Sequence, residues 1–358
     1  MKRVEKLREI IKRESLDGIF LKKKSNVNYI SRFPDEGAYV LITLKNNFLF
    51  TDGRFIELAK DKAKGFTVID WTKYNRNLSK AIIDICNEEE VKNLAFEKDT
   101  VTVDFYENLL KESNKLNLKL IPKSGLVEEL RYIKDEEEIA YIEKACEIGD
   151  KSLEQLLKDI KVGVSENDLV GKLEYYIRMN GGQGVGFETI LISGKKTSLP
   201  HGKPSEKLIE NRDFITIDFG VLYKGYTSDM TRTFIVGEPS EKQKHIYNLV
   251  KEGQQVGLNT LKAGVSAKEP DDNIRKIIKE YEKYYYAGIG HGVGLELHEE
   301  PFLGNYGNRI LEENSVITME PGLYIPDFGG VRIEDTVVIT KEGYKKLTKF
   351  PKELMILY

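Results

Sequence analysis

Residues 214–234 read FITIDFGVLYKGYTSDMTRTF, with Asp218 in the first half and Asp229 in the second. Two arms rich in β-forming residues surround a polar turn, which predicts a β-hairpin. The midpoint between the two aspartates falls between Tyr223 and Lys224, so a two-residue turn there sets them directly opposite each other on one face. Opposed ionised carboxylates about 5 Å apart repel each other unless a positive charge lies between them. The stretch therefore predicts an antiparallel sheet that carries a divalent cation.

A second hairpin is predicted in residues 318–335, which read TMEPGLYIPDFGGVRIED. Glu320 and Glu334 flank a turn-rich segment, residues 326–330, that contains their midpoint, so this hairpin brings the two glutamates together. Arg332 lies two positions before Glu334 and on a regular strand shares its face. We expect Arg332 to point into the site, where it orients a carboxylate ligand or anchors a substrate carboxylate by a forked pair.

Residues 288–301 read GIGHGVGLELHEEP and contain two of the four histidines. A dinucleotide loop is excluded because Val293 and Leu295 stand where a G-x-G-x-x-G pattern needs glycine. A zincin helix is excluded because Pro301 interrupts the helix that an H-E-x-x-H pattern requires. As a strand of period two, the segment projects His291 from one face and keeps the other face free of side chains, so that another backbone can approach. A lone histidine on a strand is more often structural than a ligand, so this stretch needs support from other residues.

The support comes from the two hairpins, which add four carboxylates to the imidazole. Either carboxylate pair alone is more typical of solvated strand ends, but five residues of ligand type on three predicted strand segments favour a metal site. Hard oxygen ligands with one nitrogen suit Mn, Co, Fe or Zn. Two divalent ions offset the negative charges of four carboxylates in full, whereas a single ion does not. The sequence therefore predicts two divalent metal ions, held by Asp218, Asp229, His291, Glu320 and Glu334.

The 358 residues are expected to form two domains. Strands alternate with amphipathic helices in the first part, which predicts an α/β domain over residues 1–122. Breaker residues at 121–125 mark the boundary. Residues 123–358 have long helices first and then glycine-punctuated strands, which predicts an α+β domain with helices flanking an antiparallel sheet. Helices of this second part are expected to begin near Asp135, Ser165 and Ser240 and to cover residues 274–285.

Composition excludes several classes of protein. The 55 basic and 58 acidic residues nearly balance, and the basic runs are short, so a nucleic-acid surface is not expected. No apolar run approaches the roughly 18 residues of a membrane span, and the charged N-terminus does not fit a signal peptide. The chain contains no G-x-S-x-G elbow and no phosphate loop. Cys86 and Cys146 form no metal or disulfide pattern, so we expect a cytoplasmic protein.

At these residues the sequence resembles the creatinase/methionine-aminopeptidase superfamily, in particular its Xaa-Pro peptidases, prolidase and aminopeptidase P. The resemblance covers most of the chain. In the second half, the family's ordered ligand set falls within the local patterns IDFG, SDMTRT, GHGVGLELHEEP, MEPGLY and VRIED. The first half resembles the family's metal-free domain in residues 26–30 and 50–54, whereas residues 31–37 depart from its glycine-containing turn.

The resemblance implies a C-terminal "pita-bread" catalytic fold and a two-metal hydrolase. It implies that Asp229 and Glu334 bridge the ions, that Asp218 chelates one ion, and that His291 with Glu320 completes the other. Two metals that share a water lower its pKa towards neutrality and polarise the carbonyl oxygen of the substrate. Glu320 is then the candidate for proton transfer.

The resemblance also places His298 near the substrate carbonyl, suited to hydrogen bonding or acid assistance, provided that the chain bends between His291 and His298. His201, in the segment SLPHG, is implied to contact substrate or transition state in a similar way. His245 lies on a predicted helix with no such support and is expected to be structural. The expected catalytic residues are therefore His201, His298, Glu320 and Arg332, with no organic cofactor.

We expect an exopeptidase that cleaves the bond between an N-terminal residue and a following proline in dipeptides or short peptides. The sequence leaves open whether it is a dipeptidase or an aminopeptidase, and methionine aminopeptidase is a weaker third option because its catalytic domain normally lacks such an N-terminal domain. The alternative from another class is a metal-free creatinase-like hydrolase or a non-catalytic binding module, which tends to lose metal ligands. The resemblance further implies a homodimer.

Overall fold

The chain divides into two compact units, residues 1–131 and 132–358. The computed structural model describes residues 2–34, 36–286 and 288–358. Within the described residues, no helix is long and apolar enough to cross a membrane. The predicted loop at 31–37 includes Asp35, which lies outside the described residues.

The first unit is the expected α/β domain, built on a six-stranded mixed sheet in the order β4-β3-β2-β1-β5-β6. Strands β1, β5 and β6 pair in parallel, and β2 pairs antiparallel with β1 and β3. Its elements are α1 (Lys2–Arg13), β1 (Gly18–Leu21), α2 (Lys24–Ser31), β2 (Tyr39–Thr43), β3 (Asn47–Thr51), α3 (Ile56–Lys62), β4 (Thr67–Asp70), η1 (Trp71–Lys73), α4 (Leu78–Glu88), β5 (Asn93–Glu97), α5 (Val103–Ser113), β6 (Lys119–Lys123) and α6 (Glu128–Tyr132).

The segment after β6 is held by the first unit through buried polar contacts, although the boundary was expected after residue 122. The Arg131 guanidinium donates to the side chains of Ser25 (3.0 Å) and Asn26 (2.8 Å), and the Asn26 amide donates to Glu128 (2.8 Å). These contacts fix α2, a helix that the sequence pattern does not predict. They also explain why the first unit extends to Arg131.

The second unit is the expected α+β domain. Its elements are α7 (Glu136–Leu156), α8 (Glu166–Met179), β7 (Gly184–Val185), β8 (Ile190–Ser193), η2 (Gly194–Ser198), β9 (Phe214–Phe219), β10 (Val221–Tyr223), β11 (Tyr226–Thr227), β12 (Met230–Val236), α9 (Glu241–Thr260), α10 (Glu269–Ile278), η3 (Lys279–Tyr284), β13 (Val316–Met319), β14 (Gly322–Ile325), β15 (Gly329–Arg332), β16 (Asp335–Ile339), β17 (Tyr344–Lys346) and β18 (Ile356–Leu357).

The caps of these helices match the sequence signals. Asp135 and Ser240 form capping boxes at α7 and α9, and the Ser165 hydroxyl accepts from the Asp168 amide at the start of α8. The helix expected over residues 274–285 is instead α10 followed by the 3-10 helix η3.

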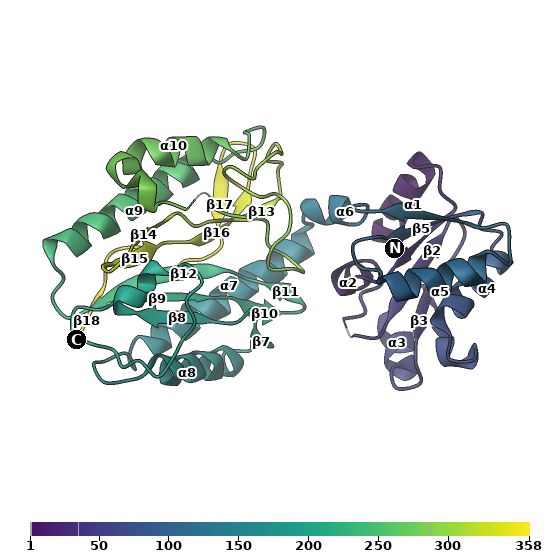
Figure 1. Cartoon of the computed structure of the whole chain (residues 1–358), viewed down its shortest axis with the longest axis horizontal. Coiled ribbons are helices and arrows are strands. Elements are labelled where there is room, and N and C mark those ends of the chain that lie inside the picture. The colour runs from purple at the N-terminus through teal and green to yellow at the C-terminus, as the bar shows by residue number, and fades with distance from the viewer. Residues whose placement is uncertain (1, 35, 287) are drawn as a thin grey trace. The chain divides into compact units, whose positions relative to one another are not determined.

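Strands of the second unit lie between two helix layers (Figure 1). Helices α7 and α8 bury one core against β8, β9 and β12, with Leu153, Leu173 and Ile217 fully buried. On the other side, α9 and α10 bury a second core against the strands of the C-terminal part, including Ile274, Ile317 and Val337. The strands between these layers are therefore largely buried, and the candidate site lies where their regular pairing is interrupted.

Candidate metal centre

The first hairpin is interrupted where Asp229 lies. Strand β9 pairs with β12 so that Asp218 faces Thr231, and β10 pairs with β11 in the same register around a turn at Lys224 and Gly225. The turn predicted between Tyr223 and Lys224 is wrong by one residue, because both turn residues adopt positive φ, 52° and 82°. Asp218 and Asp229 are therefore diagonal neighbours rather than directly opposed. They still share a face, because the register shift is two residues.

The second hairpin is confirmed, and it too is interrupted at its carboxylates. Met319 pairs with Asp335 in the β13–β16 ladder, and Gly322 pairs with Arg332 in the β14–β15 ladder. Both ladders have one register, which places Glu320 opposite Glu334 in the gap between them. Residues opposite each other across an antiparallel pair project from the same face, so the two glutamates share a face here.

The segment at 288–301 is extended but is not the regular strand that was expected. It forms single bridges, among them those of Gly292 with Ile317 and with Glu299. Its glycines do allow close approach of other backbone: a Cβ at Gly290 would lie 2.2 Å from the Thr318 carbonyl oxygen, and one at Gly292 would lie 2.3 Å from that of Glu300. Gly290 also has φ +155°, which interrupts a regular ladder.

Within this segment the chain turns back between Gly292 and Glu299, which confirms the bend expected before His298. The two histidine rings then meet edge to face, with centroids 4.3 Å apart. His291 is buried, whereas His298 is exposed at the surface of the site.

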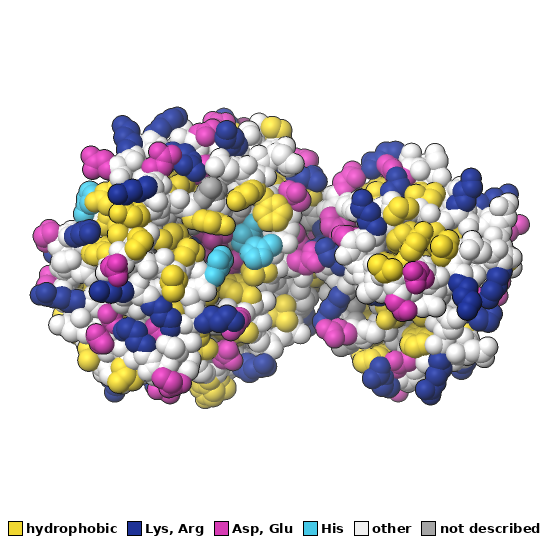
Figure 2. Space-filling model, in the orientation of Figure 1, with side chains coloured by type: hydrophobic (Ala, Val, Ile, Leu, Met, Phe, Trp, Pro, Cys, Tyr) yellow, Lys and Arg dark blue, Asp and Glu magenta, His cyan; other side chains and the backbone are white. Residues whose placement is uncertain are grey.

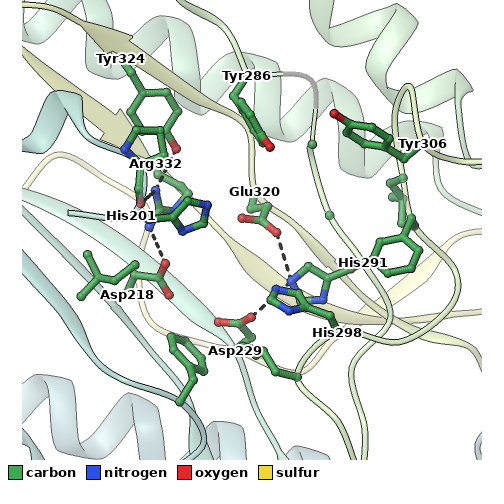
Figure 3. Close-up of a pocket in the computed structure, with 18 residues that line it drawn as sticks. His201, Asp218, Asp229, Tyr286, His291, His298, Tyr306, Glu320, Tyr324 and Arg332 are labelled. Atoms are coloured by element: carbon green, nitrogen blue, oxygen red, sulfur yellow. Dashed lines mark hydrogen bonds and ion pairs between the residues drawn. The ribbon is translucent and has the colours of Figure 1, made fainter. Parts of the chain in front are cut away.

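Three of the five expected ligands, one of which is the buried imidazole of His291, form a close cluster. Ligand atoms of Asp229, His291 and Glu334 all lie within 4.8 Å of one another. His291 Nε2 lies 3.3 Å from Glu320 Oε1 and 3.6 Å from Asp229 Oδ2. Figure 3 shows the side chains of Asp218, Asp229 and Glu320 directed towards one cavity, with His291 and His298 on one side of it. The sequence set is thus assembled by two hairpins and one irregular segment.

Hydrogen bonding of His291 leaves one ring nitrogen available to a metal. Its Nδ1 lies 3.0 Å from the Gly292 carbonyl oxygen, which can only accept, so Nδ1 carries a proton and donates. In the neutral imidazole, Nε2 then has a free lone pair directed at the carboxylates.

Buried carboxylate oxygens without partners give the clearest indication of what this site binds. Within the described residues, three such atoms belong to the expected ligands: Asp218 Oδ1, Asp229 Oδ1 and Glu334 Oε1. Buried polar atoms are almost always paired in folded proteins, and an ionised carboxylate is especially costly to leave without a partner. These oxygens with the imidazole make a donor set that fits divalent cations.

The pKa values of these carboxylates also indicate a site for a cation. Burial raises the pKa of Asp229 well above its usual range, and the neighbouring carboxylates raise it further. Burial followed by the same repulsion raises the pKa of Glu334. Burial also acts to raise the pKa of Glu320, but the nearby His291 and Arg332 and the hydrogen bond from Thr318 together outweigh it, so the pKa is lowered. A bound cation would stabilise the ionised forms of all these carboxylates.

Arg332 points into the site, as expected, and its guanidinium is fully engaged there. It pairs with Asp218 Oδ2 and donates to Thr231 Oγ1 (3.1 Å) and to the Tyr324 hydroxyl (2.8 Å). A further bond goes to the Pro200 carbonyl oxygen at 3.2 Å. The contacts favour the first of the two expected roles, orientation of a carboxylate ligand.

Sequence reasoning missed Thr231, which joins two halves of the site. Its hydroxyl donates to Glu334 Oε2 at 2.6 Å and accepts from Arg332, and its carbonyl accepts from the Glu334 amide at 3.1 Å. A signal was present, because Thr231 follows Asp229 by two residues and so shares its strand face.

A cavity of ≈ 620 Å³ adjoins these groups. Figure 2 shows histidine side chains beside hydrophobic ones on this face of the larger unit. His201 and His298 line the cavity, and His245 is not among its lining residues. The apolar part of the wall consists of Phe187, Ile190, Pro200, Tyr286, Leu297, Phe302, Leu303, Tyr306 and Tyr324.

Comparison with known proteins agrees with this geometry. Residues 140–341 match metallopeptidase family M24. The chain belongs to this family. Residues 3–133 match the creatinase/prolidase N-terminal domain. The fold, an N-terminal creatinase-type domain followed by a pita-bread catalytic domain, is therefore the one expected, and the family implies that this metallopeptidase binds divalent metal.

Relatives cover the whole chain. An Xaa-Pro dipeptidase of Pyrococcus horikoshii is 41% identical over 356 residues, which are 99% of this chain and 98% of that protein. The structure of an Xaa-Pro dipeptidase from Bacillus anthracis has a TM-score of 0.95 and 41% identity, covering 100% of this chain and 99% of the other. An X-Pro aminopeptidase from Thermotoga maritima has a TM-score of 0.91 and 32% identity, with 99% of each chain covered.

Proposed function

We propose that this metallopeptidase hydrolyses the bond between an N-terminal residue and a following proline, using two divalent metal ions. One observation carries the proposal: Asp229, Glu334 and His291 bring ligand atoms within 4.8 Å of one another, and Asp218, Asp229 and Glu334 each have a buried carboxylate oxygen without a partner, beside a cavity of ≈ 620 Å³. The relatives named as Xaa-Pro peptidases support the choice of substrate, and proline-containing dipeptides and short peptides are therefore the proposed substrates.

The wall of the cavity suits a proline-containing peptide. Apolar and aromatic side chains line most of it, and polar groups gather at the metal centre. Such a division favours an apolar ring beside a reacting amide. Phe302 and Tyr306 are exposed at the cavity, where they are available to contact substrate.

Two ions are proposed rather than one, although charge no longer decides the number. Arg332 pairs with Asp218 and supplies a positive charge that was left out of the charge argument from sequence. The number rests instead on the ligands: His291 and Glu320 would hold one ion and Asp218 would hold another, with Asp229 and Glu334 shared between the two. Mn, Co, Zn and Fe are the candidates for such oxygen and nitrogen ligands.

When bound, the ions lower the pKa of water and polarise the scissile carbonyl. Oε1 of Glu320 already lies near His291 Nε2 and accepts from Thr318 Oγ1 at 3.2 Å, so Oε2 is the atom proposed to take a proton from the attacking water. The same oxygen returns that proton to the prolyl nitrogen of the leaving group.

His298 and His201 are proposed to contact the substrate from the cavity wall. Burial, followed by the neighbouring His291, lowers the pKa of His298, so its ring is neutral at pH 7 and can donate one hydrogen bond to a developing oxyanion. Arg332 keeps Asp218 oriented, which makes it a positioning residue in this scheme.

The experiment is a substrate comparison with purified protein supplied with Mn²⁺ or Co²⁺. Release of the first residue from Xaa-Pro, with much slower release from the matched Xaa-Ala peptide, supports the proposal. No release from Xaa-Pro or Xaa-Pro-Yaa peptides contradicts it, and absence of both tightly bound metal and metal activation would favour a creatinase-like hydrolase or a binding module. Comparing Xaa-Pro with Xaa-Pro-Yaa assigns the enzyme as dipeptidase or aminopeptidase, since relatives of both names occur.

We also propose a cytoplasmic homodimer. The family resemblance supports the dimer, and the composition with its two buried thiols supports the compartment. Light scattering on the purified protein tests the oligomeric state: a mass near twice that of one chain is expected, and a monomer at working concentration contradicts the proposal.

A further inference from the structure

A buried ion pair lies directly behind the segment that carries His298. Lys134 Nζ lies 2.7 Å from Glu299 Oε1, and the side chains are 1% and 7% exposed. Glu299 is the residue after His298, whereas Lys134 belongs to the start of the second unit, far away in the sequence. The pair therefore joins two distant segments immediately beside a group proposed to contact substrate.

On one side, the pair is tied to the backbone of the turn that bears His298. The Glu299 amide donates to the Gly292 carbonyl (3.0 Å), and the Gly292 amide donates to the Glu299 carbonyl (2.9 Å). The carboxylate also lies close over Gly294, where a Cβ would approach Glu299 Oε1 to 2.6 Å. The residue that carries this carboxylate is consequently fixed to the same turn, residues 292–299, that presents the His298 ring.

On the other side, Lys134 is anchored by its own backbone. Its amide donates to the Asn314 carbonyl (3.1 Å), and Nζ lies 3.5 Å from the Tyr132 carbonyl oxygen. The next residue, Asp135, is the N-cap of α7 and accepts from the Glu138 amide. Lys134 is thus held at a fixed point from which its ammonium reaches the turn.

The energetics favour a positional role over a stabilising one. A buried ion pair often contributes no more to stability than apolar side chains of similar size, but loss of one partner leaves a buried charge without compensation. In some proteins such a pair instead fixes the geometry of the segments that it joins. Here the segment joined is the one that sets the distance between the His298 ring and His291, whose centroids are 4.3 Å apart.

We propose that Lys134 is a positioning residue for catalysis, which holds His298 at the cavity through Glu299. The proposal rests on the proposed peptidase function for its kinetic test, but its structural test does not. Displacement of a reacting or stabilising group by about 1 Å can lower a rate by roughly 100-fold. Removal of the Lys134 charge should therefore act on kcat through His298.

The kinetic experiment compares Lys134→Met with the wild type at saturating Mn²⁺. We expect kcat to fall about 10- to 100-fold because His298 is displaced. The metal content should be unchanged, because no metal ligand is altered. Lys144→Met is the matched control: it removes a lysine from an exposed ion pair with Glu147 on α7 and should leave kcat unchanged. In a His298→Ala background, Lys134→Met should lower kcat no further. An equal fold-loss in both backgrounds would overturn the proposal, since Lys134 would then not act through His298.

The structural experiment measures amide hydrogen exchange of the same metal-loaded variants. Lys134→Met should speed exchange at residues 292–300 selectively, and unchanged exchange there would overturn the proposal even if no peptidase activity were found. Inactivity of the wild type towards Xaa-Pro peptides, by contrast, would contradict the proposed function alone. Should Lys134→Met fail to fold, Glu299→Gln keeps the shape and removes the charge, and the same two results are expected of it.

Discussion

Glu320 and Glu334 lie opposite each other in a break between two β-ladders that share a single register. Regular pairing on both sides fixes the separation of the two carboxylates, and burial removes the water that would otherwise screen them. The fold therefore brings like charges together before any cation binds. Four predictions follow from this arrangement and its neighbours.

Glu334→Gln should change the stability of the metal-free and metal-loaded protein in opposite directions. In metal-free protein the substitution relieves repulsion between buried carboxylates, so the free energy of unfolding should rise on the order of 1 kcal/mol. With Mn²⁺ present the variant should lose most of the metal-dependent gain and nearly all activity. Urea unfolding with and without Mn²⁺ measures both effects, and a loss of stability in both states would be contrary to this account.

Metal binding itself should stabilise the protein. Removal of metal by a chelator should lower Tm, and Mn²⁺ at about 100 times its dissociation constant should restore about 2.7 kcal/mol of stability for each ion bound. Mg²⁺ at equal concentration should restore less, because the imidazole ligand favours transition metals. Differential scanning calorimetry gives the shift, and a Tm indifferent to every divalent ion would count against the metal centre.

Thr231→Val should weaken metal binding although Thr231 is not a proposed ligand. The substitution keeps the shape of the side chain but removes the hydroxyl that bonds Glu334 and Arg332. Loss of such a partner typically lowers metal affinity about 10- to 100-fold. Titration of metal-free protein with Mn²⁺ measures the change. Thr260→Val on α9, which removes a hydroxyl that donates to the Val256 carbonyl and accepts from Asn273 on α10, is the control and should leave affinity unchanged.

Arg332→Met should destabilise the protein more than Arg332→Lys. Methionine leaves Asp218 buried without its cationic partner, at an expected cost of about 3–5 kcal/mol in the absence of metal. Lysine keeps the charge but cannot reproduce the fork that also reaches Thr231 and Tyr324, so it should keep most of the stability and lose activity. Unfolding curves and kcat of both variants test this. Equal stability of the two would mean that charge is not what Arg332 supplies.

Sequence patterns predicted the strand faces of this site better than its register. Asp218 and Asp229 share a face because side chains alternate along strands, and that inference survives a shift of two residues. Their pairing depends on the turn at Lys224 and Gly225. A lysine at positive φ is uncommon, so the sequence does not predict that Lys224 is a turn residue.

Other features depend on contacts between distant segments. Helix α2 has no side-chain N-cap and buries polar residues such as Asn26, which is held by Glu97, Glu128 and Arg131. The sequence of such a helix lacks the regular spacing of apolar residues by which amphipathic helices are recognised. The engagement of Arg332 is similar in kind, since its partners lie in four separate segments, and the Lys134–Glu299 pair joins residues that no sequence spacing relates.

The most direct test of the central claim is the rate of Xaa-Pro hydrolysis as Mn²⁺ is added stepwise to metal-depleted protein, at a protein concentration well above the dissociation constant. The account predicts no hydrolysis without metal and a rate that rises to a plateau at two equivalents per chain. Full activity in the presence of a strong chelator, or no hydrolysis at any metal concentration, would contradict it.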